Sequence, residues 1–131
     1  MSKVRGIRGA IKVKENAKEC ILDATTELLQ KIIDENEIDP SEISAVMFTA
    51  TPDLNAEFPA YAARKIGWTM VPLICACEID VAESMKSVIR VLVNVNTDKE
   101  QRQMKHQYIG ETRRFHPDLF GGMNDDSNNE T

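Results

Sequence analysis

One arginine stands inside the most strand-like run of this sequence. Residues 88–93 are apolar and rich in β-branched side chains apart from Arg90, and the run has the length of a buried strand. A guanidinium keeps its charge, and removing it from water is costly unless an anion lies beside it. Either the protein or a ligand must supply that anion. Arg8 stands in a similar apolar stretch, and the two arginines together predict a site for a small, multiply charged anion.

The composition is that of a small acidic protein. With 131 residues, 42% of them hydrophobic, the chain can form one domain with a modest core. The formal net charge of −5 argues against a general nucleic-acid binder, so a functional positive charge must be local. The first residues lead into no apolar signal region, and no run approaches the ~18 apolar residues of a membrane span. Because the three cysteines form an odd set, we expect a cytoplasmic protein with free thiols.

The first predicted strand covers residues 3–13. Its alternation gives one apolar face and places Arg8 on the other face, beside the small residues Gly6 and Ala10. These neighbours leave room for a ligand over the guanidinium.

A long helix and further strands are predicted to follow. Asn16 has the sequence context of an N-cap, with Glu19 completing a capping box, and apolar residues at helical spacing predict a helix over 17–35. The other predicted elements are a turn at 39–42, strands at 43–50, 71–76 and 86–97, a short helix at 59–66 ended by Gly67, and an extended segment at 105–115.

This order, β-α-β-α-β-β-β, indicates a mixed α/β (α+β) fold in which one long helix packs on one face of a mixed β-sheet. The other face of the sheet then needs cover, and association of several copies is the natural cover for so small a chain. We expect a single domain at 1–120, followed by a polar, disordered tail at 121–131.

Four polar residues within or next to the apolar strands are candidates for function: Arg8, Glu78, Arg90 and Tyr108. The same residues also permit a purely structural interpretation. Arg90 and Glu78 could form an ion pair that serves stability alone, Arg8 could be an ordinary strand-edge arginine, and Tyr108 a half-buried aromatic residue.

Cysteine chemistry and metal binding are less favoured. Cys75 and Cys77 stand near Glu78, but no second Cys or His pair has metal-binding spacing. A nucleophilic cysteine needs a nearby base, and His106 and His116 are the only histidines. The sequence also contains neither a P-loop nor a dinucleotide-binding glycine motif. We therefore expect no metal and no cofactor.

A series of short blocks extends along residues 3–119. They are Val4-Arg5-Gly6-Ile7-Arg8-Gly9-Ala10, Thr49-Ala50-Thr51-Pro52-Asp53-Leu54-Asn55-Ala56-Glu57-Phe58-Pro59-Ala60, Ala62-Ala63-Arg64, Gly67-Trp68, Val71-Pro72-Leu73-Ile74-Cys75, Glu78-Ile79-Asp80-Val81, Ile89-Arg90-Val91, Tyr108 and Pro117-Asp118-Leu119. In order and spacing the sequence resembles the trimeric α/β class of chorismate mutase, the AroH type, and not the all-helical class. Together these blocks are far more specific than any one of them.

The resemblance implies conversion of chorismate to prephenate by a Claisen rearrangement, for phenylalanine and tyrosine biosynthesis. This reaction needs no nucleophile, metal or cofactor. The substrate carries two carboxylates, its enol-pyruvyl arm must fold over the ring, and negative charge develops on the ether oxygen as the C–O bond breaks. An enzyme therefore has to select the compact conformer and place positive charge at that oxygen.

The resemblance also implies roles for particular residues. Arg90 is the implied cation at the ether oxygen, Arg8 and Tyr108 the implied carboxylate ligands, Glu78 the acceptor of the ring hydroxyl that also orients Arg90, and Cys75 a polar contact near Glu78 or the hydroxyl.

In the family the protein is a pseudo-barrel homotrimer with a site at each subunit interface. Phe58, Ala60 and Arg64 are accordingly implied to come from the neighbouring subunit. The chain departs from the family pattern at Tyr61, where relatives often carry a basic residue, at Ile74, where they can carry Thr, and at Phe115-His116, where they carry Leu-Arg. The first and last of these departures reduce the positive charge at the mouth of the site.

Two other functions remain open at this stage. A trimeric deaminase of the RidA-like kind has a similar fold, places an arginine at its subunit clefts and hydrolyses enamines or imines. A non-catalytic trimeric sensor would bind a small aromatic carboxylate without converting it.

Overall fold

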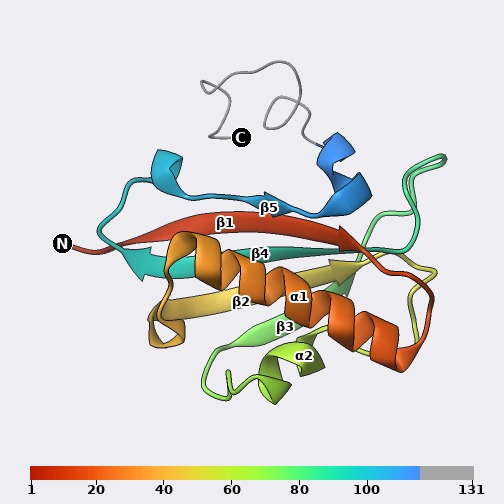
Figure 1. Ribbon diagram of the computed structural model, residues 1–131, viewed down its shortest axis with the longest axis horizontal. Coiled ribbons are helices and arrows are strands. Elements are labelled where there is room, and N and C mark those ends of the chain that lie inside the picture. Colours follow the sequence, from red (N-terminus) through yellow and green to blue (C-terminus); the bar gives the residue numbers. More distant parts are fainter. Residues whose placement is uncertain (116–131) are drawn as a thin grey trace.

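The computed structural model describes residues 1–115, which form one mixed sheet with helices on one side (Figure 1). The predicted order of strands and helices is confirmed. No helix within 1–115 is long and apolar enough to cross a membrane. The strands are β1 (Lys3–Lys12), β2 (Ile43–Ala50), β3 (Leu73–Cys77), β4 (Val88–Thr97) and β5 (Gln107–Tyr108); the helices are α1 (Lys18–Asn36) and α2 (Ala60–Lys65), with 3₁₀ turns at Pro40–Glu42, Gln101–Gln103 and Gly110–Phe115.

Strand β4 lies at the centre of the five-stranded sheet, whose order is β3-β2-β4-β1-β5. It pairs antiparallel with β1 on one side and with β2 on the other. The outer strands β3 and β5 are each parallel to their neighbours. Arg90 is therefore held in the central strand, whose backbone is paired on both sides.

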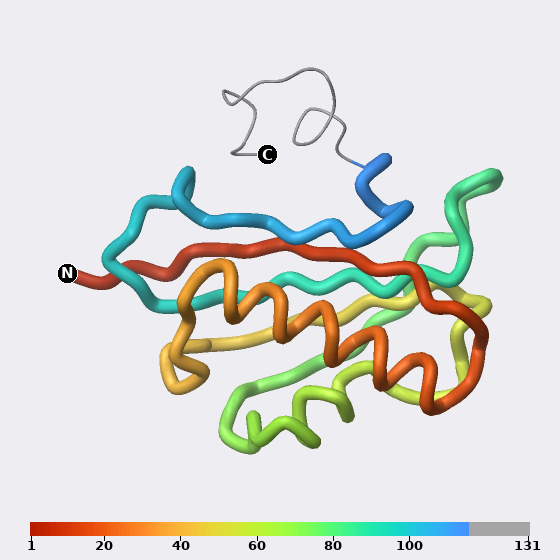
Figure 2. Tube along the Cα trace, viewed as in Figure 1, coloured from red at the N-terminus to blue at the C-terminus, as the bar shows by residue number. Residues whose placement is uncertain are grey.

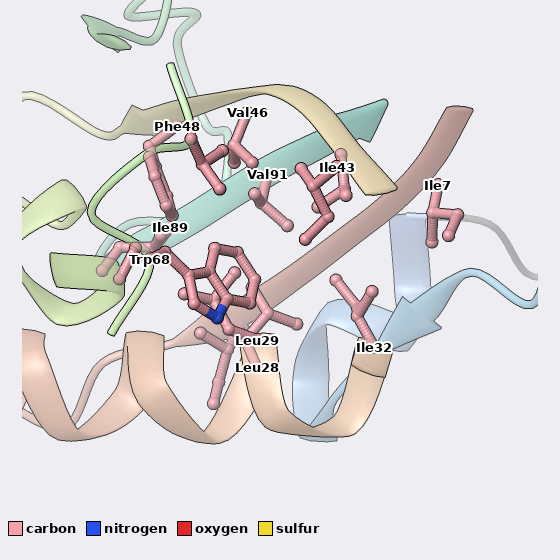
Figure 3. Packing of buried hydrophobic residues seen from close by; sticks show 14 of the residues in the cluster. Ile7, Leu28, Leu29, Ile32, Ile43, Val46, Phe48, Trp68, Ile89 and Val91 are labelled. Atoms are coloured by element: carbon pink, nitrogen blue, oxygen red, sulfur yellow. The ribbon is translucent and has the colours of Figure 1, made fainter. Parts of the chain in front are cut away.

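The core lies between the sheet and α1, which crosses one face, while α2 packs beside α1 and β3 (Figures 1 and 3). Alternate residues of β1, β2 and β4 point into this layer because side chains of a strand alternate between its faces. Leu28 and Ile32 of α1 and Trp68 after α2 close the layer from the helical side. The core residues from the strands include Ile7, Ile11, Val46, Phe48, Ile89, Val91, Val93 and Val95.

The start of α1 differs from the prediction. Its N-cap is Ala17, and no side chain caps it. The amide of Asn16 instead crosses to the loop after β2, where its Oδ1 accepts hydrogen bonds from the backbone N–H groups of Asn55 and Ala56, both at 3.0 Å. Its Nδ2 donates to the side-chain oxygen of Asn55 at 2.8 Å. A tertiary contact therefore replaces the local cap that the sequence pattern predicts.

The predicted extended segment at 105–115 is mostly wrong. Only Gln107–Tyr108 form a strand, and Gly110–Phe115 turn into a 3₁₀ helix. The backbone leaves the sheet at Gly110, whose φ of 64° favours glycine. The hydroxyl of Thr112 then donates to the carbonyl of Ala10 at 3.0 Å, which fixes the turn against β1.

Two predicted strands begin later than expected. β3 starts at Leu73 and not at 71, because Pro72 has no N–H to donate to the ladder. β4 starts at Val88 and not at 86, because Ser87 has a left-handed φ of 61°. The chain between β3 and β4 projects beyond the sheet (Figure 2).

Some predictions fall outside the described residues. They concern His116, Pro117-Asp118-Leu119, the end of the domain at residue 120 and the tail at 121–131.

Gly9 allows β1, β5 and α1 to approach one another closely. A Cβ at this position would lie 2.9 Å from the carbonyl oxygen of Gln107, 3.0 Å from Leu28 and 3.1 Å from Ile32. We expect Gly9→Ala to lower the free energy of unfolding by about 1–3 kcal/mol, the usual cost of overpacking. Urea denaturation measures this difference.

Gly6→Ala is the matched control on the same strand. Its Cβ would meet Leu92 at 3.5 Å and Asn94 at 3.7 Å, which are ordinary contact distances. An equal loss of stability in both variants would contradict the packing role of Gly9.

Candidate active site

The pairing register places a row of residues side by side on the sheet face opposite α1. Arg90 of β4 lies opposite Thr49 of β2 and opposite Ala10 of β1, and Ala10 in turn lies opposite Tyr108 of β5. Ala10 is fully buried and packs with Tyr108 and Val88 in a small cluster, against which Phe115 also packs. Arg8 follows on the same face, two residues back along β1.

Glu78 contacts Arg90 from the end of β3. Its Oε2 lies 3.5 Å from Nε of Arg90 and also accepts a hydrogen bond from the hydroxyl of Thr49. The side chains of Arg90 and Glu78 are 44% and 25% exposed. The predicted pair therefore forms, but it is not deeply buried, and the guanidinium remains accessible to a ligand.

Phe115 covers one side of the same guanidinium. Cζ of Arg90 lies 4.3 Å from the centroid of the Phe115 ring, within the range of a cation–π contact. Phe115 occupies a position where the sequence departs from the family pattern, and its stacking on Arg90 was not predicted. The sequence does show an aromatic residue shortly after Tyr108. It gives no sign of the turn at Gly110–Phe115 that brings this residue back over the sheet.

Tyr108 faces both arginines. Burial raises the pKa of its phenol, while the nearby charges of Arg8 and Arg90 act to lower it. The phenol therefore stays protonated at neutral pH and can donate a hydrogen bond. Arg8 is fixed through its backbone, whose N–H donates to Nδ1 of His106 at 2.9 Å.

These side chains line one open cavity of about 190 Å³. It holds two permanent cations, a phenol and a single carboxylate, surrounded by apolar side chains. Such a lining can bind a compact dianion and accept a hydrogen bond from a hydroxyl of the ligand. The lining residues are Arg8, Gly9, Met47, Thr49, Glu78, Arg90, Val91, Leu92 and Tyr108.

Cys75 lies elsewhere: within one chain it is on the opposite face of the sheet from Glu78, and its polar contact near Glu78 or the ring hydroxyl stays a prediction. Cys75 pairs with Phe48, packs against the core and therefore faces the helical side of the sheet, whereas Glu78 faces the other side with Thr49. Side chains alternate between the two faces of a sheet, so residues 75 and 78, which are three positions apart, point to opposite faces. Burial raises the pKa of the Cys75 thiol, and a hydrogen bond with the backbone of Ala60 lowers it in part.

Phe58 and Cys75 both line a second cavity of about 470 Å³, formed by the loop after β2 and the end of β3. Phe58 is 59% exposed, and its ring meets that of Tyr61 edge to face, with the centroids 5.5 Å apart. Arg64 is exposed on α2. The structure thus gathers Arg8, Glu78, Arg90 and Tyr108 in one place and leaves the other predicted residues outside that cavity.

Metal-binding groups do not assemble within residues 1–115. The structure there has no cluster of three or more His, Cys, Asp or Glu side chains that could hold a metal ion. Cys20, Cys75 and Cys77 are free thiols.

Known proteins similar to this chain share one activity in their names. Residues 4–119 match the family model of chorismate mutase type I. The chain is 44% identical over 117 residues to chorismate mutase AroH of Bacillus subtilis (strain 168), covering 88% of this chain and 92% of the relative. It is 50% identical over 117 residues to chorismate mutase AroH of Thermus thermophilus, covering 88% and 96%.

The fold has a close counterpart among solved structures. A chorismate mutase from Clostridium thermocellum superposes with a TM-score of 0.82 at 41% sequence identity. The match covers 83% of this chain and 97% of that one.

The charges around Tyr108 can be tested by titration. In a Tyr61→Phe protein Tyr108 is the only tyrosine, because the sequence contains two. We expect its pKa to lie above the usual ~10 of tyrosine, and to rise further in Arg8→Gln because the lost positive charge no longer favours the phenolate. The near-ultraviolet absorbance of tyrosinate against pH measures both values.

Lys99→Gln is the control, since Lys99 pairs with Glu37, away from the residues that line the Arg90 cavity. A fall of the Tyr108 pKa in Arg8→Gln, or an equal rise in Lys99→Gln, would contradict the arrangement described.

Proposed function

Because this chain belongs to the chorismate mutase type I family and is an isomerase that converts chorismate to prephenate, we propose that its catalytic centre is the cavity around Arg90. The observation that carries this proposal is the convergence of Arg8, Glu78, Arg90 and Tyr108 on one cavity. The family places the reaction in aromatic amino acid biosynthesis. The deaminase and sensor alternatives are not retained, since the family match extends over residues 4–119.

The proposed role of Arg90 follows from the charge that develops during the rearrangement. Negative charge grows on the ether oxygen as the C–O bond breaks, so a cation fixed at that oxygen stabilises the transition state more than the substrate. The backbone of Arg90 is fixed by the pairing of β4 with β1 and β2. Its side chain is held by Glu78 at Nε and by the ring of Phe115. A preorganised guanidinium of this kind needs little reorganisation during the reaction.

The other residues of the cavity are proposed to select the compact conformer. Arg8 and the protonated phenol of Tyr108 bind the substrate carboxylates, and Glu78 accepts the hydrogen bond of the ring hydroxyl. Holding both carboxylates and the hydroxyl at once restricts the enol-pyruvyl arm to the geometry from which the new bond forms. No covalent step involves the protein.

We also propose a homotrimer in the cytoplasm with sites shared between subunits. Within residues 1–115, neither α1 nor α2 covers the sheet face that carries Arg90, and this face exposes four large apolar side chains: Val4, Met47, Ile74 and Leu92. Such a surface favours association of copies. Free thiols fit a reducing compartment.

Phe58, Ala60 and Arg64 would then close the site of the neighbouring subunit. Phe58 is exposed and lines the same second cavity as Cys75, and we propose that at a shared site Cys75 supplies the polar contact near Glu78 or the ring hydroxyl. This arrangement would explain why neither Cys75 nor Phe58 reaches the Arg90 cavity of its own chain.

Arg90→Lys tests the role at the ether oxygen. We expect turnover of chorismate to fall by about 10²–10³-fold, because an ammonium cannot copy a planar guanidinium that binds Glu78 on one edge and a ligand on another. The loss of chorismate, followed by ultraviolet absorbance, measures the rate.

Arg90→Ala is assayed alongside, and circular dichroism checks that both variants fold. Near-normal turnover of folded Arg90→Lys would contradict the proposed role. If Arg90→Ala fails to fold while Arg90→Lys is folded and fully active, the ion pair with Glu78 serves stability alone.

Mixed trimers test whether sites are shared. Arg90→Ala and Arg64→Ala subunits are each expected to have low activity alone. If each site takes Arg90 from one chain and Arg64 from the next, every mixed trimer contains one intact site. An equal mixture, refolded together, should then recover roughly a quarter of wild-type activity.

The control mixes Arg90→Ala with Arg8→Ala, because both residues are proposed to lie on the same side of the interface. Mixing these two variants cannot create an intact site. In that mixture each site takes Arg8 and Arg90 from one chain, and no recovery is expected. Activity of the first mixture no higher than the mean of its two components would contradict sharing.

A further inference from the structure

The side-chain carboxylate of Glu78 contacts two side chains from different strands, Thr49 of β2 and Arg90 of β4. The hydroxyl of Thr49 donates to Oε2 of Glu78, the same oxygen that lies 3.5 Å from Nε of Arg90. Thr49 also lies directly opposite Arg90 in the pairing of β2 with β4. The three side chains therefore form a compact chain of contacts, Thr49 to Glu78 to Arg90.

Glu78 needs such support because of its place in the fold. It follows the end of β3, and its own backbone N–H makes one more ladder bond, to the carbonyl of Ala50 at 2.9 Å. The next residue, Ile79, is already 83% exposed, and the chain beyond it projects away from the sheet (Figure 2). A glutamate side chain at the start of such a loop has considerable rotamer freedom.

Thr49 has the opposite character. It stands within β2, whose backbone is paired with β3 and β4. A β-branched side chain in a strand is restricted at χ1, so its hydroxyl is held in place by the sheet. A donor fixed in this way can restrict the carboxylate of Glu78 to one position.

We propose that Thr49 is a positioning residue for the rearrangement: its hydroxyl holds the Glu78 carboxylate against the Nε edge of Arg90. The remaining edge of the guanidinium is thereby directed toward the ligand. The inference rests on the proposed catalytic role of Arg90 and extends it to a residue that acts through Glu78.

Thr49→Val is the primary test, because valine keeps the shape and the β-branch and removes only the hydroxyl. We expect kcat for chorismate to fall about ten- to a hundredfold, the usual range for loss of a hydrogen bond to a charged group. KM should change little, since Arg8 and Tyr108 still bind the carboxylates. Thr49→Ser keeps the hydroxyl and should restore most of the lost kcat.

Ser44→Ala is the matched control on the same strand. The hydroxyl of Ser44 donates to the backbone carbonyl of Asn94 at 3.2 Å and does not line the cavity. We expect its kcat to equal that of the wild type. A merely structural effect of losing a strand hydroxyl would lower both variants alike.

The Glu78→Ala background separates action through Glu78 from direct contact with the substrate. Without the carboxylate, adding Thr49→Val should cause no further loss of kcat. A further loss as large as in the wild-type background would contradict the proposal, as would a wild-type kcat for folded Thr49→Val.

The assay separates failure of the inference about Thr49 from failure of the proposed function. If the wild type converts chorismate and Thr49→Val does so equally well, only the inference about Thr49 is wrong. If Thr49→Val does not fold, Thr49→Ala and Thr49→Ser carry the test: equal kcat in these two variants overturns the proposal, and loss in alanine alone supports it.

Discussion

The register of the central strand is the constraint on which the site depends. Because β4 is paired with β1 and β2, the position of Arg90 is set from both sides. A slip by one residue would turn the guanidinium into the core and expose the valines that now pack under α1. The same pairing brings Thr49, Ala10 and Tyr108 into one row across the sheet. One strand therefore determines both the core and the charged face.

Much of this arrangement is encoded locally and could be predicted. Alternation along β1 and β4 places Arg8 and Arg90 on the face away from α1, and the order of elements follows from apolar runs and turn signals. What could not be predicted depends on contacts between distant segments. Asn16 binds the loop after β2 in place of capping α1, and the turn at Gly110–Phe115 returns Phe115 to Arg90. No local pattern specifies either partner.

The cavity combines a fixed charge with open access. Glu78 offsets part of the charge of Arg90 without burying it, so the guanidinium is held in place and still meets solvent. The apolar side chains around it lower the local polarity, which strengthens the interaction of a bound anion with the arginines. Catalysis by such a site consists of prearranged charge and shape, and the rigidity of the sheet is what makes prearrangement possible.

The edge of β1 beside β5 is completed largely by side chains. The amide of Gln101 accepts a hydrogen bond from the N–H of Gly6 at 2.9 Å and donates to its carbonyl at 2.6 Å, while His106 accepts from the N–H of Arg8. A side-chain amide thus imitates a peptide group of a neighbouring strand. Because these backbone groups are occupied, this stretch offers no template on which a misfolded copy could extend the sheet into an aggregate.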